Sequence, residues 1–292
     1  MDKTRKNLFF ILWFYTLLVI LWGAWVRISH SGDGCGDHWP LCAGEVIPDF
    51  KQTKTIVEYF HRVMSGTYGI FVVYLFFKFK NTTTPHFKKL LYAVLLLTAS
   101  EALIGALLVK LELVSVNDSF LRLLFMSLHQ LNSFLLTAIC YLLYKCSDLD
   151  KNFKPSPKLI LFIVVSVTGA IAALSTTLFP TQSLWQGILN DFQTHSHPFI
   201  QLRILHPVLA LSIMSYFIVY YYLKNNIRFA LEIFAVAFIG LITLVSLSPL
   251  ALKLSHLLIA HLLWSRFLAV TSLTESQTRS SVRSIQKDGI NN

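Results

Sequence analysis

Hydrophobic residues gather in eight long blocks, separated by short polar stretches. Each block approaches the roughly 20 residues that an α-helix needs to cross a bilayer. The pattern therefore predicts an all-α polytopic membrane protein whose polar tail after Thr271 is disordered. No small-residue cleavage site follows the first block, so we expect it to be a retained span. The predicted transmembrane helices are 8–26, 59–77, 90–109, 123–144, 159–178, 204–223, 229–247 and 254–272.

Composition agrees with this interpretation and sets the topology. The chain is 54% hydrophobic and 14% charged, whereas a soluble domain is usually about 25% charged. The stretches on the N-terminal side of the predicted membrane hold 16 of the 25 Lys and Arg residues. The positive-inside rule then places both termini in the cytoplasm, for a multi-pass protein of the inner membrane. The net charge of +10 is explained by topology in a lipid bilayer and indicates no nucleic-acid partner.

The chain divides near its middle at the hydrophilic stretch 145–158, which contains two prolines. We expect two halves of four spans each, 1–150 and 151–292. The sequence Gly169-Ala170 in the fifth span weakly resembles Gly23-Ala24 in the first. The short loops leave little room for a separate soluble domain.

Four histidines lie within about two turns of the outer end of alternate spans, namely His61, His129, His206 and His256. Ionisable groups at membrane depth are costly and usually take part in function. Facing helices of a bundle core can build a cofactor site, and two imidazoles from different helices suit the axial positions of a haem iron. We therefore expect His61 to pair with His129 and His206 with His256, as iron ligands.

The remaining histidines are expected to lie outside these pairs. His261 is five positions past His256, so it cannot share the same helix face. The others fall in loops, where solvated histidines are common: His30, His38, His86, His195 and His197. Basic residues near the four helix mouths could hold porphyrin carboxylates or extend to lipid headgroups. They are Arg62, Arg122, Arg203 and Lys253.

Two further features carry chemistry. Cys35 and Cys42 are the cysteines of the predicted outer side, with six residues between them. A disulfide is favoured there because that side is oxidising, and free thiols or half of a metal site remain as alternatives. Two acids, Glu58 and Glu101, lie in or beside apolar blocks. Glu58 is either a functional carboxylate or a partner of Arg62 or Arg27, and Glu101 is expected to hydrogen-bond to a neighbouring helix.

Many of these residues together resemble the haem A synthase family, over nearly the whole chain. The matching features are Gly23-Ala24, Val26-Arg27, Ser29, Ser31-Gly32, Gly34-Cys35, Trp39-Pro40, Cys42, Glu58, His61-Arg62, Gly105, His129-Gln130, His206-Pro207, His256 and Trp264. The first half carries the more specific motifs, and the second half rests chiefly on its two histidines. Glu101 departs from the family, which commonly has glutamine there.

The resemblance implies two pseudo-symmetric four-helix bundles and the oxidation of a haem O methyl group to the formyl group of haem A. In that scheme His61 and His129 flank the substrate haem, while His206 and His256 hold a permanent haem b. Arg62 contributes to cofactor binding, Glu58 is the catalytic carboxylate, and a Cys35–Cys42 disulfide braces the loop over the substrate site. Implied partners are haem O, a haem O synthase and an electron donor or acceptor, with homo-oligomerisation left open.

Two other functions use the same residues. A dihaem b-type cytochrome that transfers electrons explains the four histidines equally well, but it does not explain Glu58 beside a ligand or the cysteine loop. A transporter or structural membrane protein could use buried histidines as proton relays without a cofactor. Pigment in the purified protein separates the last alternative from the other two.

Overall fold

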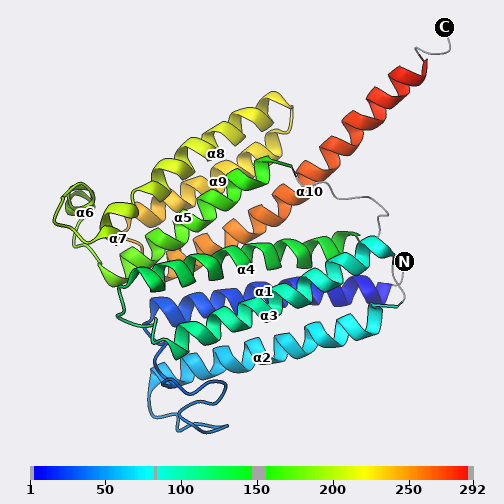
Figure 1. The fold of residues 1–292 in the computed structure, drawn as a ribbon. Helices are drawn as coiled ribbons and strands as arrows, with labels where there is room; N and C mark the ends of the chain where they lie inside the picture. The colour runs from blue at the N-terminus through cyan, green and yellow to red at the C-terminus, as the bar shows by residue number, and fades with distance from the viewer. Residues whose placement is uncertain (1–2, 82–83, 147–155, 289–292) are drawn as a thin grey trace.

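The computed structural model describes residues 3–81, 84–146 and 156–288, and this part of the chain is helical (Figure 1). Its only β-type pairing is an isolated bridge between Cys42 and Glu45. The helices are α1 (Lys3–Ile28), α2 (Thr53–Phe79), α3 (Pro85–Lys110), α4 (Phe120–Cys146), α5 (Lys158–Leu178), α6 (Leu184–Asp191), α7 (Pro198–Leu202), α8 (Leu205–Leu223), α9 (Ile227–Val245) and α10 (Leu250–Asp288).

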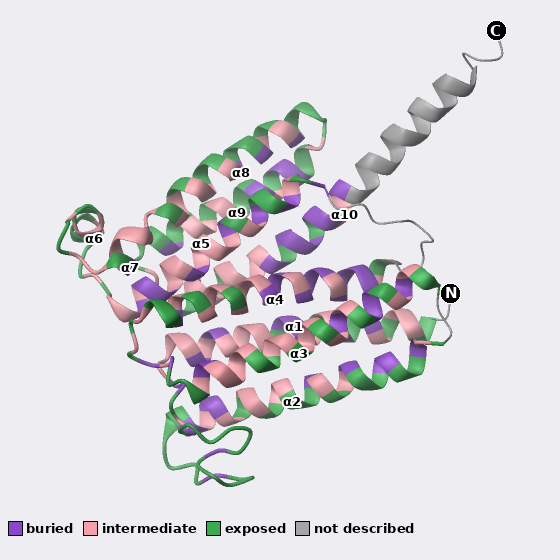
Figure 2. Ribbon diagram, in the orientation of Figure 1, coloured by how far each residue is buried: buried purple, intermediate pink, exposed green. Residues whose placement is uncertain are grey.

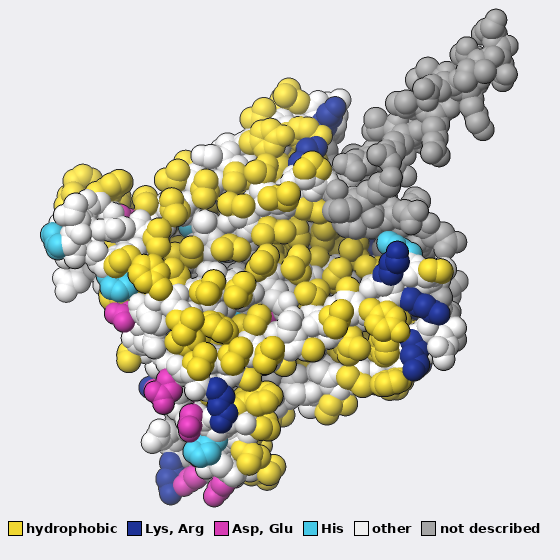
Figure 3. Space-filling model, viewed as in Figure 1, with side chains coloured by type: hydrophobic (Ala, Val, Ile, Leu, Met, Phe, Trp, Pro, Cys, Tyr) yellow, Lys and Arg dark blue, Asp and Glu magenta, His cyan; other side chains and the backbone are white. Residues whose placement is uncertain are grey.

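Seven helical segments of the described chain are long and apolar enough to cross a membrane, so the protein is a multi-pass membrane protein. They are α1, α3, α4, α5, α7 with α8, α9, and α10 as far as Thr271. The eighth predicted span, α2, is 27 residues long but is not among them. Polar residues such as Glu58, His61 and Arg62 lower the mean hydropathy of its first turns. Figure 3 shows a broad hydrophobic band, with Lys and Arg at the end where the N-terminus lies and a mixture of Lys, Arg, Asp, Glu and His at the opposite end.

The structure corrects one detail of the predicted helices. The loop between α5 and α8 contains the short helices α6 and α7, which the hydrophobic pattern did not indicate. Helix α10 ends at Asp288. The prediction of a disordered tail after Thr271 falls on residues whose side chains and surroundings the structure does not describe.

Two hydrophobic clusters hold the helices together. The first joins α1, α2, α3 and α4 through residues such as Phe9, Val72, Leu91 and Leu143. The second joins α4, α5, α8, α9 and α10, with Phe162, Phe217, Phe229 and Phe267 at its centre. The buried residues line the faces where helices meet (Figure 2). Both clusters lie toward the helix ends remote from the four histidines, so the apolar packing leaves the outer halves of the helices free to present polar groups.

Helix α4 contacts both groups of helices because it contributes to both clusters. The indole N–H of Trp264 on α10 donates to the Phe134 carbonyl of α4 at 2.9 Å. Trp13 on α1 donates to the Ser265 hydroxyl on α10 at 3.2 Å. These bonds fix α10, and therefore His256, relative to the first four helices.

Candidate functional site

Each of the four histidines packs against a glycine on the long helix that precedes its own. A Cβ atom added to Gly23 would lie 2.9 Å from His61 Cε1, and one on Gly169 would lie 3.0 Å from His206 Cε1. A Cβ atom added to Gly240 would lie 2.8 Å from His256 Cε1. A Cβ atom added to Gly105 would lie farther from its histidine, at 3.9 Å from His129 Cε1. Any larger residue at the three close positions would move the imidazole, so the glycines set where the rings lie.

In the second half, His206 and His256 face one another with their ring centroids 6.4 Å apart and their planes at 65°. Two imidazoles that bind one metal ion from opposite sides, each through a metal–nitrogen bond of about 2 Å, place their centroids roughly 6 Å apart. The separation therefore fits a single metal ion between the rings. Because the rings come from opposite sides, this geometry suits the two axial positions of a porphyrin iron.

The hydrogen bonds of the ring nitrogens differ among the four histidines. Nδ1 of His61 and His256 is buried without a hydrogen-bond partner among the described atoms, and Nδ1 of His129 lies 3.5 Å from Glu101 Oε1. Buried polar atoms of this kind are normally bonded. His206 differs, because its Nδ1 lies 3.2 Å from the Val165 carbonyl and 3.4 Å from the Thr168 hydroxyl. A proton on Nδ1 there leaves Nε2 as the metal-binding nitrogen, so the residues present fit a haem iron.

In the first half, His61 on α2 and His129 on α4 are close enough for charges on their rings to interact. Glu101 Oε1 on α3 lies 3.5 Å from His129 Nδ1. The same carboxylate accepts hydrogen bonds from Ser133 and from the Asn132 amide, the latter at 2.5 Å. The expected bond from Glu101 to a neighbouring helix is thus present, and it joins α3 to α4 beside His129.

Glu58 lies one turn before His61 and its side chain is only 3% exposed. Its Oε2 accepts the Cys35 backbone N–H at 2.8 Å, and its Oε1 lies 2.5 Å from Arg62 Nη2. The Nη1 group of Arg62 donates in addition to the carbonyls of His38 and Leu41. Arg62 therefore contacts the carboxylate and the loop here, and its binding to a porphyrin stays a prediction.

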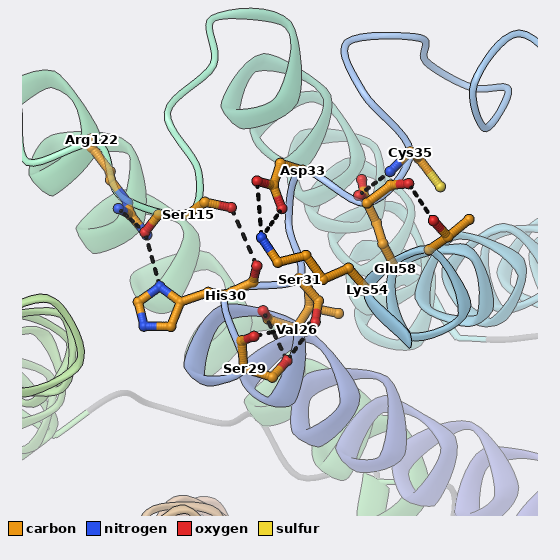
Figure 4. A network of polar contacts seen from close by, with 12 residues as sticks. Val26, Ser29, His30, Ser31, Asp33, Cys35, Lys54, Glu58, Ser115 and Arg122 are labelled. Carbon is orange, nitrogen blue, oxygen red and sulfur yellow. Dashed lines mark hydrogen bonds and ion pairs between the residues drawn. The ribbon is translucent and has the colours of Figure 1, made fainter. Parts of the chain in front are cut away.

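The loop above Glu58 is closed by a disulfide between Cys35 and Cys42, as predicted. Both cysteines are buried. The loop is also attached to the start of α2, since Lys54 Nζ lies 3.1 Å from Asp33 and the Thr55 hydroxyl donates to the Gly34 carbonyl at 2.8 Å. Figure 4 shows this polar network, which ends at Glu58 on one side and at Arg122 on the other. It presents the Cys35 N–H to the carboxylate.

The histidines set aside from sequence lie outside the two pairs. His261 is buried between α10 and α4, with Nδ1 3.0 Å from the Thr137 hydroxyl and its ring against Phe134. His30 lies 3.3 Å from the Ser115 carbonyl. His197 accepts the Phe199 N–H at the start of α7. Arg203, before His206, makes an ion pair with Asp191 at 2.6 Å.

The sequence interpretation missed all four histidine–glycine contacts, although it names Gly23 and Gly105 as residues of the family resemblance. It includes Gly169 only in a weak internal resemblance, and it does not single out Gly240. The spacing from glycine to histidine ranges from 16 residues for Gly240–His256 to 38 for Gly23–His61. No single motif could have found them, although a glycine at matched depth in each odd-numbered span was a usable signal.

Comparison with known proteins identifies a family. A family described as COX15-CtaA, cytochrome oxidase assembly protein, matches residues 6–268. The chain belongs to this family. It is also 31% identical over 296 residues to a protein of Thermus thermophilus named "Protoheme IX farnesyltransferase", a match covering 92% of this chain and 48% of the relative.

Other relatives match shorter segments of this chain, and their names differ from that of the Thermus protein. A "Heme A synthase" of Symbiobacterium thermophilum is 54% identical over 57 residues, 20% of this chain and 18% of that protein. Another, of Alkalihalophilus pseudofirmus, is 41% identical over 92 residues, 31% of each chain. The chain spans about half the length of the Thermus relative and less of these two in the matched segments.

Proposed function

We propose that this protein is a haem A synthase, an oxidoreductase that converts the methyl group of haem O to a formyl group and so supplies haem A for cytochrome oxidase. The observation that carries the proposal is the pair His206 and His256, 6.4 Å apart, together with a similar pair whose first member follows a buried carboxylate. Membership of a cytochrome oxidase assembly family supports it. So do the names of the heme A synthases that match in part.

The architecture that goes with this function has eight transmembrane helices in two pseudo-symmetric four-helix bundles, with α2 as the eighth span. Residues 1–150 hold the substrate haem between His61 and His129, and residues 151–292 hold a permanent haem b between His206 and His256. Repetition of the histidine–glycine contact, twice in each half, supports the pseudo-symmetry. The protein lies in the inner membrane with both termini in the cytoplasm, where a haem O synthase and an electron carrier are its expected partners.

In the mechanism, the bound haems supply the redox chemistry. His61 and His129 would hold the iron of the substrate haem, and their rings are positioned by Gly23 beside His61 and by Glu101 beside His129. Glu58 Oε1 or Oε2 is the acceptor for the proton that leaves during oxidation of the methyl carbon. The Cys35 N–H and Arg62 hold the carboxylate in place, and the disulfide loop excludes water from above it.

The test is extraction and chromatography of the haems from protein co-expressed with a haem O supply. Haem A or hydroxylated haem O alongside haem b is the expected result. Two haem b per chain would support the electron-transfer cytochrome instead. A preparation without haem would refute both.

Three variants assign the site within the same experiment. His61→Ala or His129→Ala should lose haem O and haem A while keeping haem b, and unchanged pigment would contradict the pairing. Glu58→Gln should bind haem O and accumulate it, because the amide cannot accept the proton. Glu45→Gln, in the exposed part of the same loop, is the matched control and should make haem A normally.

A further inference from the structure

Three basic residues from three helices lie at the outer ends of the two histidine pairs. Arg27 is four residues past Gly23 on α1, Arg122 is seven residues before His129 on α4, and Lys253 is three residues before His256 on α10. These spacings place each of them on the same helix face as the glycine or histidine of its helix, one or two turns further out. The first two belong to the first half of the chain and Lys253 to the second.

The charge of Arg27 interacts with the charges of both other residues, Arg122 in its own half and Lys253 in the other half. The helices that carry the three residues are in contact, since α10 packs against both α1 and α4. Arg122 is only 2% exposed, and Arg27 and Lys253 are partly buried. Like charges that are close together and partly removed from water are costly unless an anion compensates them.

The described residues supply little of that compensation. None of the three makes an ion pair among the described residues. Arg122 Nη1 donates to the carbonyls of Ser115 and Asn117. Lys253 Nζ donates to the Thr177 hydroxyl. The Nε atoms of Arg27 and Arg122 are buried without a hydrogen-bond partner there. Asp118 is within electrostatic range of Arg122, but its side chain is 60% exposed and lies 3.6 Å from His197.

We propose that Arg27, Arg122 and Lys253 form a single anion site at the seam between the two halves, and that it binds the carboxylates of the porphyrins held beneath it. The inference rests on the proposed function, because it needs porphyrins between the histidine pairs. Guanidinium groups with unused N–H donors suit carboxylates, which they bind through charge-assisted hydrogen bonds.

The position of the cluster favours porphyrin carboxylates over the phosphate of a lipid, which would offer the same anionic oxygens. The cluster stands directly outward of the histidine–glycine contacts, and loop backbone surrounds it. The Ser115 carbonyl, which accepts from Arg122, also lies 3.3 Å from His30 Nδ1 of the first outer loop (Figure 4). Since cations from both halves share the site, the charge of a porphyrin in one half acts on the other half.

The test compares iron protoporphyrin IX with its dimethyl ester, which has the same ring but no carboxylate charge. Full-length protein produced in cells that make no haem is titrated with each compound, and binding is followed at the Soret band. The wild type should bind the free acid at least about tenfold more tightly than the ester, and Arg27→Gln and Arg122→Gln should each bind the two compounds nearly equally. Lys51→Gln, whose amine is exposed and paired with Asp49, should keep the wild-type preference.

Thermal unfolding shows whether the variants are folded and gives a second readout. Removing a buried, uncompensated charge should leave the haem-free Arg27→Gln protein at least as stable as the wild type. Adding iron protoporphyrin IX should then raise the Tm of the variant less than that of the wild type. An equal rise in both proteins would contradict the proposal.

The remaining outcomes separate this inference from the proposed function. If Arg27→Gln and Arg122→Gln bind porphyrin and keep the wild-type preference for the acid, the anion site is overturned and the proposed function is not. Equal binding of acid and ester by the wild type also overturns the anion site for porphyrin carboxylates. In that case, native mass spectrometry that detects phospholipid on the wild type but not on Arg27→Gln would identify a lipid phosphate as the occupant. If neither compound binds, both proposals fall.

Discussion

A histidine that packs against a glycine can approach the neighbouring helix more closely than any other arrangement allows. Three of the four histidines use this fully, because a Cβ on Gly23, Gly169 or Gly240 would lie 2.8 to 3.0 Å from an imidazole carbon. Real Cβ atoms essentially never come closer than 3.0 Å, so the ring would have to move at Gly23 and Gly240, and at Gly169 the contact would be very tight. In the proposed site such a shift would strain the bond from the imidazole to the iron, so the glycines would matter together with the histidines.

We predict that Gly240→Ala lowers haem b occupancy and that Gly23→Ala lowers haem O or haem A occupancy, each by severalfold and each without unfolding the protein. On helix propensity alone, both changes should stabilise a helix by about 1 kcal/mol. Pyridine haemochrome assay and haem chromatography measure the two occupancies. The matched control is Gly66→Ala on α2, where nothing lies within 4 Å of an added Cβ. Normal haem content in Gly240→Ala would mean that the ring has room to shift.

At the scale of elements, the first outer loop and the start of α2 behave as one unit. The disulfide brings Cys35 and Cys42 together, the Cys35 N–H bonds Glu58, and Arg62 binds the loop carbonyls of His38 and Leu41. The loop thus positions a carboxylate that belongs to the helix. Helix α6 is attached in a related way, because Arg203 joins Asp191 and the Gly187 carbonyl.

We expect the double variant Cys35→Ser/Cys42→Ser to loosen this unit. Opening a loop of about eight residues should cost roughly 2–3 kcal/mol in the chain-entropy model. The exposed Lys51 in the freed loop should then be cleaved by trypsin much faster than in the wild type. Mass mapping of the peptides measures this, and haem A output should fall because Glu58 loses a fixed donor. Equal cleavage rates in both proteins would show that the salt bridge and hydrogen bonds hold the loop without the disulfide.

At the scale of the molecule, charge and packing are arranged along the same axis. Hydrophobic clusters join the helices toward one end, and Lys and Arg gather beyond them on the face shown in Figure 3. The histidines, Glu58 and the disulfide loop lie toward the other end. The apolar packing and the polar candidate site therefore lie at opposite ends of the helices.

The topology predicts which surfaces are reachable from outside the cell. In a background without Cys140 and Cys146, Val46→Cys should react with a membrane-impermeant maleimide in intact cells treated to open the outer barrier. Val46 is 74% exposed in the outer loop. Lys80→Cys, at the opposite end of α2, should react only after the inner membrane is disrupted. The reverse pattern would contradict both the positive-inside assignment and the outward position of Glu58.

The sequence by itself determined the helical class and seven of the eight predicted membrane spans, because hydrophobic length acts locally along the chain. It also indicated the Cys35–Cys42 disulfide, which the structure contains. It did not indicate α6 or α7, since short segments lack a strong hydrophobic signal. Only the tertiary structure decided which groups meet across helices. Gly240 with His256, Glu101 with His129, and the cluster of Arg27, Arg122 and Lys253 depend on helix rotation and crossing, which are set by packing between residues far apart in the chain.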